Sequence, residues 1–338
     1  MQYRPLGRTG VQVSPLTLGA MMFGPWGNDD RQDSIRIIHR ALDAGINVVD
    51  TADVYSAGAS EEIVGEALQG RRDEVFLATK FFMPMDDDPN HRGGSRRWII
   101  REVEESLRRL RTDHLDLYQV HRPSPDTDVE ETLGALTDLV RQGKVRYIGS
   151  SSFSGSQIVE AQWAARERNL ERFVTEQPPY SILVRGIESD VLPTVQRHGM
   201  GTLTYSPLSG GWLSGRWRKD AASSPTSSAR PSARFDMSTP ANQRKLDLVE
   251  DLAQLADQAG MPLLELAIAF VVNHPGVTSA IVGPRTMEQL ESYLPAVERT
   301  LPADVLDRID EIVAPGVTVN PDDDSYGVHE LAPAARRR

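Results

Sequence analysis

Four side chains of this 338-residue sequence could together carry acid–base chemistry: Asp50, Tyr55, Lys80 and His121. Each stands at or just after the end of a short apolar run. A tyrosine is a weak acid with a reference pKa of about 10, but a nearby ammonium favours its phenolate and makes it a better proton donor. Asp50 could hold Lys80 charged, and His121 could hydrogen-bond a substrate oxygen. The combination suits protonation of the oxyanion that forms when a carbonyl is reduced.

Each of these four residues also has an ordinary structural explanation. An Asp–Lys pair at a strand end is usually a structural ion pair, and a lone tyrosine usually packs with its hydroxyl satisfied. A lone histidine is usually an ordered hydrogen-bonding residue. The functional interpretation is favoured because all four are expected on one face of the fold.

The elements that would position these residues alternate along the chain. Short β-branched or apolar runs are followed by longer amphipathic ones, which is typical of βα units around a parallel sheet. The predicted strands are 13–20, 46–52, 74–80, 114–121, 145–151, 172–179, 201–208 and 278–284. Eight strands indicate an α/β fold of the (β/α)8 or TIM-barrel type, whereas a doubly wound sheet usually has about six. In such a barrel the carboxyl ends of the strands form the active-site face.

Amphipathic runs between these strands predict helices. They lie at 34–45, 98–110, 129–143, 157–168, 245–260 and 286–294. The first has an apolar stripe of Ile35, Ile38 and Leu42 and ends at Gly45, which suits a left-handed C-cap.

Three segments fall outside the repeat, and none requires a domain boundary, so residues 1–338 are expected to form one barrel domain. Residues 2–13 are predicted to form a hairpin before the first strand. Residues 216–240 are rich in Ser, Pro and Arg without periodicity, which predicts a mobile loop that is either a lid or a plain insertion. The tail, 314–338, is predicted to be an extended C-terminal loop.

Polar residues gather at the predicted strand ends. They are Asp50, Asp53, Tyr55, Lys80, His121, Arg122, Ser150, Ser151, Ser152, Glu176, Gln177, Tyr205, Ser206, Arg285 and Thr286. No GxGxxG follows a strand, so the Rossmann dinucleotide fingerprint is absent and the residues alone do not identify an electron source. Trp26, in the first predicted βα loop, could line a substrate pocket with Tyr55 and His121 or could be a packing aromatic.

The composition argues against several functional classes. The 37 Lys and Arg against 48 Asp and Glu, a net charge of −11, disfavour a broad nucleic-acid surface. The lack of cysteine excludes a disulfide scaffold, a thiolate metal site and a cysteine nucleophile. The seven histidines show no HExxH or HxH spacing, and the DDD runs at 86–88 and 322–324 are interpreted as solvated loop charges, so no metal is expected. The start lacks an apolar signal region and the longest apolar run, 263–272, is too short to span a bilayer, so we expect a soluble cytoplasmic protein with no membrane partner.

Seven segments carry a resemblance to a known family. They are YRPLGRTGVQVSPLTLGAMMFG (3–24), NVVDTADVYSAGASEEIVGEAL (47–68), LATK (77–80), SLRRLRTDHLDLYQVHRP (106–123), LVRQGKVRYIGSSSF (139–153), YSPLSGGWLSGR (205–216) and IVGPRTMEQLE (281–291). In this order they resemble the aldo-keto reductases over nearly the whole chain. The resemblance implies a (β/α)8 barrel closed at its base by an N-terminal hairpin.

The resemblance also implies site residues. The implied catalytic tetrad is Asp50, Tyr55, Lys80 and His121, with Tyr55 as general acid, Lys80 and Asp50 tuning it, and His121 orienting a small carbonyl substrate. The implied cofactor is NADP(H), with the nicotinamide supplying hydride. The residues implied in binding it are Gly19, Met21, Asp50, Ser151, Ser152, Gln177, Tyr205, Ser206, Leu208, Gly210, Gly283, Arg285, Gln289 and Tyr293.

Several of these cofactor contacts have an expected role. Gln177 would meet the carboxamide, Tyr205 would stack on the nicotinamide ring, and the residues after Tyr205 would line the pyrophosphate. Arg285 lies at the helix start after the last strand, where a 2′-phosphate would be favoured, so NADPH is expected over NADH. Gln289 would be a second contact in that helix.

Two positions depart from the family pattern. The usual Ser-Asn after the fifth strand is Ser151-Ser152, so one carboxamide contact would be lost or replaced by a shorter hydroxyl. The usual Glu-Asn at the adenine is Ser292-Tyr293, which suggests stacking instead.

Three functions fit the resemblance. The first is an NADPH-dependent aldehyde or ketone reductase, and the second is a sugar-nucleotide or secondary-metabolite ketoreductase of the same family. The third is a cofactor-sensing regulatory subunit, because potassium channel β subunits share this fold and much of this motif set. The lack of an additional N-terminal segment that could act on a partner favours an enzyme, and no feature of the sequence indicates an oligomeric state.

Overall fold

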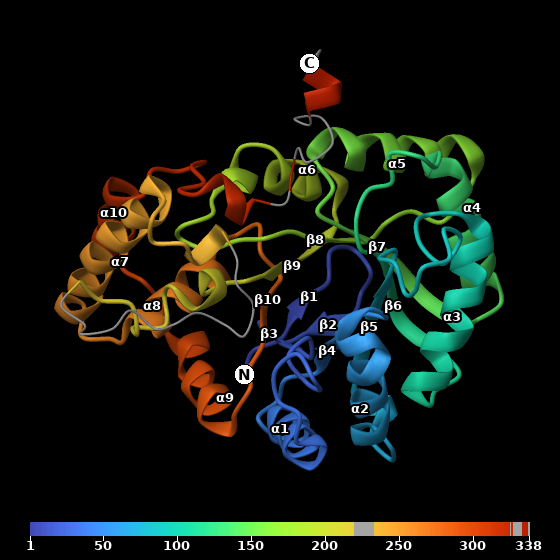
Figure 1. Ribbon diagram of the computed structural model, residues 1–338, viewed down its shortest axis with the longest axis horizontal. Helices are drawn as coiled ribbons and strands as arrows, with labels where there is room; N and C mark the ends of the chain where they lie inside the picture. The colour runs from blue at the N-terminus through green and yellow to red at the C-terminus, as the bar shows by residue number, and fades with distance from the viewer. Residues whose placement is uncertain (220–232, 325, 327–332, 337–338) are drawn as a thin grey trace.

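The computed structural model describes residues 1–219, 233–324, 326 and 333–336. Eight parallel strands close into a barrel in the order β10, β3, β4, β5, β6, β7, β8, β9, with helices around it (Figure 1). The strands are β3 (Leu16–Gly19), β4 (Val48–Asp50), β5 (Phe76–Phe81), β6 (Leu115–Val120), β7 (Val145–Ser151), β8 (Thr175–Gln177), β9 (Gly201–Tyr205) and β10 (Ser279–Val282). The fold is a TIM barrel, and all eight predicted strands are confirmed, several of them shorter than predicted.

Ten α-helices are found among the described residues. They are α1 (Arg31–Asp43), α2 (Ala59–Ala67), α3 (Arg96–Leu110), α4 (Val129–Arg141), α5 (Gly155–Arg168), α6 (Val191–His198), α7 (Pro240–Gln258), α8 (Leu263–Asn273), α9 (Met287–Tyr293) and α10 (Ala303–Ile312). The six predicted helices are confirmed, and α1 is followed by Gly45 at φ 92°, as its C-cap pattern predicted. The predictions missed α2, α6, α8 and α10. In α8 almost every residue is buried, so no polar face reveals its helical period.

The N-terminal hairpin is confirmed and closes one end of the barrel. Its strands β1 (Arg4–Pro5) and β2 (Gln12–Val13) pair antiparallel. Leu6 and Val13 form a small apolar cluster with residues near the starts of the barrel strands, such as Phe76. Because this cluster fills the amino-terminal end of the barrel, the opposite end, where the strands finish, is left for the site.

The described ends of the predicted 216–240 loop are packed. Trp217 is buried and stacks on Trp212 with ring centroids 4.1 Å apart, and Arg218 forms a 2.8 Å ion pair with Glu250 on α7. Residues 217 and 218 of this segment thus contact the rest of the fold, and the mobility of the loop stays a prediction. Residues 220–232, where the lid was expected, lie outside the described residues.

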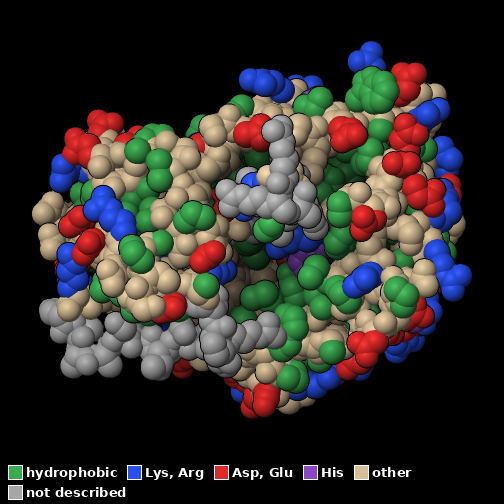
Figure 2. Space-filling model, turned by 45° about the horizontal axis from the view of Figure 1, so that its top comes forward, with side chains coloured by type: hydrophobic (Ala, Val, Ile, Leu, Met, Phe, Trp, Pro, Cys, Tyr) green, Lys and Arg blue, Asp and Glu red, His purple; other side chains and the backbone are tan. Residues whose placement is uncertain are grey.

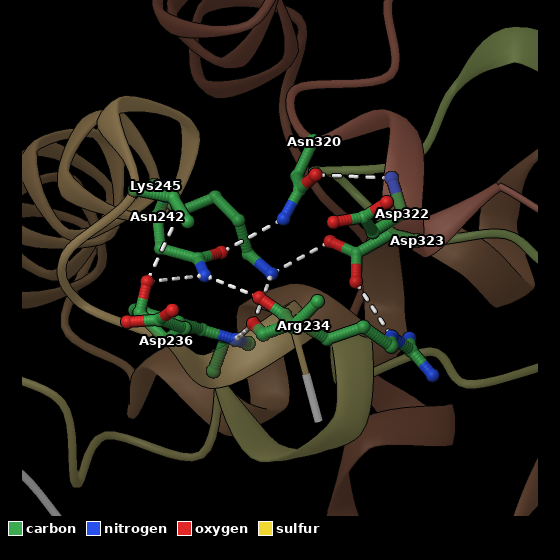
Figure 3. A network of polar contacts seen from close by, with 10 residues as sticks. Arg234, Asp236, Asn242, Lys245, Asn320, Asp322 and Asp323 are labelled. Carbon is green, nitrogen blue, oxygen red and sulfur yellow. Dashed lines mark hydrogen bonds and ion pairs between the residues drawn. The ribbon is translucent and has the colours of Figure 1, made fainter. Parts of the chain in front are cut away.

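The tail is also partly docked, and the interpretation of 322–324 as solvated charges is wrong at Asp323. Its carboxylate is buried, 2.6 Å from Lys245 Nζ on α7 and 2.7 Å from Arg234 Nε (Figure 3). A buried charge needs a partner, and this partner lies 78 positions away in the sequence. The local pattern of three aspartates therefore could not reveal the ion pair.

Within the described residues, no single helix is long and apolar enough to cross a membrane. The pair α7 and α8 satisfies the length and composition criteria only when taken together, across a 91° bend. Most residues of α8, Leu263 and 266–272, are buried inside the fold.

Candidate active site

Neighbouring strand ends bring Asp50, Lys80 and Tyr55 together. Asp50 ends β4, Lys80 lies near the end of β5, and the two strands pair directly in the barrel. Lys80 Nζ donates to Asp50 Oδ1 at 2.5 Å, to the Thr51 carbonyl at 2.9 Å and to the Tyr55 hydroxyl at 3.4 Å. The lysine is fully buried, so its charge depends on these oxygens and not on water.

A strained turn presents Tyr55 to Lys80. The chain after Tyr55 is left-handed at Ser56 (φ 51°), Ala57 (φ 54°) and Gly58 (φ 92°). Non-glycine residues rarely adopt this conformation, so the surroundings must hold it. The Tyr55 ring lies edge-on to His121 at 5.7 Å and is 6.2 Å from the Trp26 ring, so the structure brings all four tetrad candidates and Trp26 to one place.

Burial and charge oppose each other at the Lys80–Tyr55 pair. Burial alone would lower the pKa of Lys80, but Asp50 and Tyr55 outweigh it and the pKa is raised. Burial also raises the pKa of Tyr55 by more than the Lys80 charge lowers it. Lys80 thus lowers the pKa of Tyr55, as predicted, but burial outweighs this effect and the phenol stays protonated at neutral pH. The site thus holds a protonated phenol beside a fixed cation.

His121 is a neutral ring at this site. Burial, followed by the charges of Lys80 and Arg122, holds its pKa well below the usual range. Its Nδ1 is buried, and within the described part of the chain no group hydrogen-bonds to it. A neutral imidazole can donate from one nitrogen to a substrate oxygen without placing a second positive charge beside Lys80.

Gln119 is a site residue that the sequence analysis missed. Its side-chain amide donates to Asp50 Oδ2 at 3.1 Å, and Gln177 donates to the same oxygen at 2.9 Å and to Gln119 Oε1 at 3.2 Å. Gln119 precedes His121 by two positions, so it faces the barrel interior like that residue. A polar side chain two positions before the strand-end histidine, and so on the same face of the strand, was the available signal.

The end of β7 lies against Gln177 and Tyr205. Ser151 Oγ donates to the Gln177 carbonyl at 2.9 Å, and the Ser152 hydroxyl lies 3.2 Å from that of Tyr205. The Arg122 guanidinium also donates to Ser152 Oγ. Ser152 therefore occupies a hydrogen-bonded position between Arg122 and Tyr205, which no pattern in its own segment shows.

The chain after β9 forms a loop rich in left-handed residues. Ser206, Ser209, Gly210 and Gly211 all have positive φ, and Gly210 packs toward Phe235. Ser209 Oγ is buried, and among the described residues none pairs with it. Leu208 is half-buried against the core. This loop therefore holds an unsatisfied hydroxyl beside its turns.

The ends of β3 and β10 hold the remaining cofactor candidates. Gly19 ends β3 and Gly283 directly follows the neighbouring strand β10, and a Cβ on Gly19 would be only 2.7 Å from Ile281 Cγ2. Met21 and Arg285 are exposed, and no described residue forms an ion pair with the Arg285 guanidinium. Two further candidates are engaged by the fold: Gln289 Oε1 accepts from the Arg285 backbone at 2.8 Å, and Tyr293 is buried.

The face in Figure 2 is hollowed near its middle, where Lys or Arg and His side chains lie beside hydrophobic ones. The model of the aldo/keto reductase family matches residues 15–314 of the chain. The chain belongs to this family. It is 41% identical over 323 residues to the uncharacterized oxidoreductase YrpG of Bacillus subtilis, covering 92% of this chain and 96% of that protein.

Two further relatives carry different names. The aldo-keto reductase YhdN of Bacillus subtilis is 35% identical over 341 residues, 99% of each chain. A probable voltage-gated potassium channel subunit beta of Arabidopsis thaliana is 35% identical over 327 residues, 93% of this chain and 97% of that protein. The protein is therefore an oxidoreductase of the aldo-keto reductase family, whose members typically depend on NAD(P)H.

Proposed function

We propose that this aldo-keto reductase reduces an aldehyde or ketone to the alcohol with NADPH, taking the proton from Tyr55. The observation that carries the proposal is the buried Lys80, which is held by Asp50 at 2.5 Å and faces the Tyr55 hydroxyl at 3.4 Å. When bound, the nicotinamide supplies the hydride. The oxyanion that forms takes the phenolic proton, and the Lys80 ammonium stabilises the phenolate left behind.

The other tetrad residues orient the reaction. Asp50 accepts from Lys80, Gln119 and Gln177, so it fixes the direction of the lysine. The neutral His121 would donate to the carbonyl oxygen from the side of Tyr55. Trp26, beside the Tyr55 ring, would form the wall of the substrate pocket with these two side chains.

The residues present fit an NADP(H) molecule. Because the Gln177 amide nitrogen is engaged by Asp50 and Gln119, its Oε1 is left to accept from the carboxamide, with Ser151 and Ser152 alongside. Tyr205 would stack on the nicotinamide. The buried, unsatisfied Ser209 hydroxyl fits a pyrophosphate lined by Ser206, Leu208 and Gly210.

At the adenosine end, the exposed Arg285 guanidinium suits a 2′-phosphate, which supports NADPH over NADH. The other residues proposed to line the cofactor are Gly19, Met21, Asp50, Gly283, Gln289 and Tyr293. The expected compartment remains the cytoplasm.

The proposal is tested by following NADPH oxidation with an aromatic aldehyde. The Tyr55→Phe variant removes only the phenolic hydroxyl, and with it the proton to be donated, so turnover should fall by about 10²–10⁴-fold while NADPH binding persists. A Tyr3→Phe variant, at an exposed tyrosine of the N-terminal segment, serves as the matched control. Normal turnover by Tyr55→Phe would sink the assignment of the acid.

Two other functions remain as alternatives. A sugar-nucleotide or secondary-metabolite ketoreductase would show a much higher kcat/KM for those carbonyls across a substrate panel than for simple aldehydes. The relatives described as channel β subunits favour a cofactor-sensing role as the second alternative. Tight NADPH binding without turnover on every carbonyl tested would support that role against the enzyme.

A further inference from the structure

A buried arginine lies behind the candidate active site, between two acidic residues. Arg109, on α3, donates through Nε to Glu61 Oε2 on α2 at 2.6 Å. Its Nη2 donates both to Glu102 Oε1 and, at 3.3 Å, to Ser106 Oγ. All four side chains are buried. The arginine therefore ties α2 to α3, and none of these residues belongs to the proposed tetrad or cofactor set.

The first link from this ion pair to the site runs through β5. The second oxygen of Glu61, Oε1, accepts from Thr79 Oγ1 at 2.6 Å. Thr79 directly precedes Lys80, and side chains alternate along a strand, so Thr79 points toward the helices while Lys80 points into the barrel. Glu61 thus fixes β5 from behind at the residue next to the lysine.

The second link runs through the turn that carries Tyr55. Gly58 ends this left-handed turn, and a Cβ on Gly58 would lie only 2.8 Å from Arg109 Cδ. The aliphatic part of Arg109 therefore packs directly against the turn. Because Ser56 and Ala57 are in a conformation that they rarely adopt, the turn depends on such support.

We propose that Arg109 is a positioning residue for reduction, setting the separation between the Tyr55 hydroxyl and Lys80 Nζ through the 56–58 turn on one side and through Glu61 and Thr79 on the other. This inference rests on the proposed function. The charges that bear most on Tyr55 are those of Lys80, Asp50 and Arg122, so Arg109 acts on it through geometry. The 3.4 Å contact is at the long limit of a hydrogen bond, so a small shift of either group breaks it.

The chain offers a matched control in Arg185. This arginine is also buried between two carboxylates, 2.8 Å from Glu188 and 2.7 Å from Asp310. Its other guanidinium partners among the described residues, the Val313 carbonyl and the Phe270 ring, lie outside the proposed site. Arg109→Met and Arg185→Met should both lower the melting temperature. Only Arg109→Met should lower kcat, by about 10–100-fold per folded molecule, with the Kd for NADPH unchanged within twofold.

A second pair of variants covers the case in which Arg109→Met does not fold. Thr79→Val removes only the link between Glu61 and β5 and should lower kcat several-fold, whereas Thr79→Ser keeps the hydroxyl and should restore it. If turnover depends on Tyr55 but Arg109→Met and Thr79→Val keep wild-type kcat, the positioning role of Arg109 is overturned while the proposed function stands. If Tyr55→Phe turns over like wild type, the proposed function falls, and the role of Arg109 with it.

Discussion

Two buried lysine–aspartate pairs in this molecule have nearly the same geometry. Lys80 Nζ lies 2.5 Å from Asp50 and Lys245 Nζ lies 2.6 Å from Asp323, and both lysines are fully buried. Each ammonium also lies over an aromatic ring, at 5.1 Å from the Tyr55 centroid and 4.5 Å from the Trp212 centroid. Judged by the ion pair and the presence of a neighbouring ring alone, the two lysine–aspartate sites would be equivalent.

Their surroundings make them different. Burial and the Arg234 charge lower the pKa of Lys245 more than Asp323 raises it, whereas Asp50 and Tyr55 overcome burial and raise the pKa of Lys80. Lys80 faces an ionisable phenol, while Lys245 faces an indole that has no proton to give at neutral pH. The comparison teaches that the aromatic side chain beside each lysine, and not the ion pair, distinguishes the two sites.

Amide side chains flank both pairs as well. Gln119 and Gln177 donate to Asp50, whereas Asn320 donates to Asn242 at 2.8 Å beside the second pair (Figure 3). The first set joins strand ends around the candidate active site. The second joins the tail to α7 and to the turn at 233–235, so its expected effect is on stability.

Replacing the two lysines should separate their roles most clearly. Lys80→Met removes the cation beside Tyr55, so kcat for aldehyde reduction should fall by about 10²–10⁴-fold. Lys245→Met is the matched change at the other pair and should leave kcat per folded molecule within about twofold. Steady-state NADPH oxidation, normalised to folded protein, measures both. Equal losses in the two variants would break the comparison.

The second expected effect is on stability. Lys245→Met leaves the buried Asp323 carboxylate with Arg234 as its remaining cation, so the free energy of unfolding should fall by about 3 kcal/mol, near the lower end for a broken buried pair. Urea denaturation measures the loss. The double variant Lys245→Met/Asp323→Asn removes both charges and should recover part of it. No recovery would show that packing, and not the unpaired charge, is responsible.

Replacing the amide side chains beside the two ion pairs should change kcat and stability less than replacing the lysines. Gln119→Ala removes one donor from Asp50 and frees Gln177 from one partner, so kcat should fall by about tenfold, or about 1.4 kcal/mol. Asn242→Ala removes hydrogen bonds to the Ala233 and Asp236 carbonyls and should lower stability while sparing kcat. A Gln119→Ala enzyme with wild-type kcat would remove Gln119 from the candidate site.

The smallest expected effect is on how the free energy of unfolding changes with pH at alkaline pH. The two lysines should change it in opposite directions. Lys245 has a lowered folded pKa, so wild type gains stability relative to Lys245→Met as pH rises toward the unfolded value of about 10.5. Lys80 has a raised folded pKa, so wild type loses stability relative to Lys80→Met as pH rises above about 10.5. Unfolding free energies between pH 8 and 11 test the two slopes. Slopes of the same sign would contradict the assigned directions.

Much of the fold and the composition of the candidate site could be predicted from local patterns. Alternating apolar and amphipathic runs located all eight strands, because each strand is buried over its own few residues. The tetrad candidates were found because each lies at or just after the end of a strand, and parallel strand ends meet on one face. The helix α8 was missed because its burial leaves no polar face, and Gln119 was missed because its partners, Asp50 and Gln177, lie on other strands.

The sequence by itself therefore determined the order of elements and which residues meet at the carboxyl ends of the strands. Only the tertiary structure decided the protonation of these groups, such as the neutral His121, because a buried pKa depends on charges brought close from distant segments. It also decided that Asp323 is buried against Lys245 and that Arg109 supports the turn after Tyr55. These contacts join Lys245 to Asp323 across 78 positions and Gly58 to Arg109 across 109 − 58 = 51 positions, separations over which no local periodicity carries information.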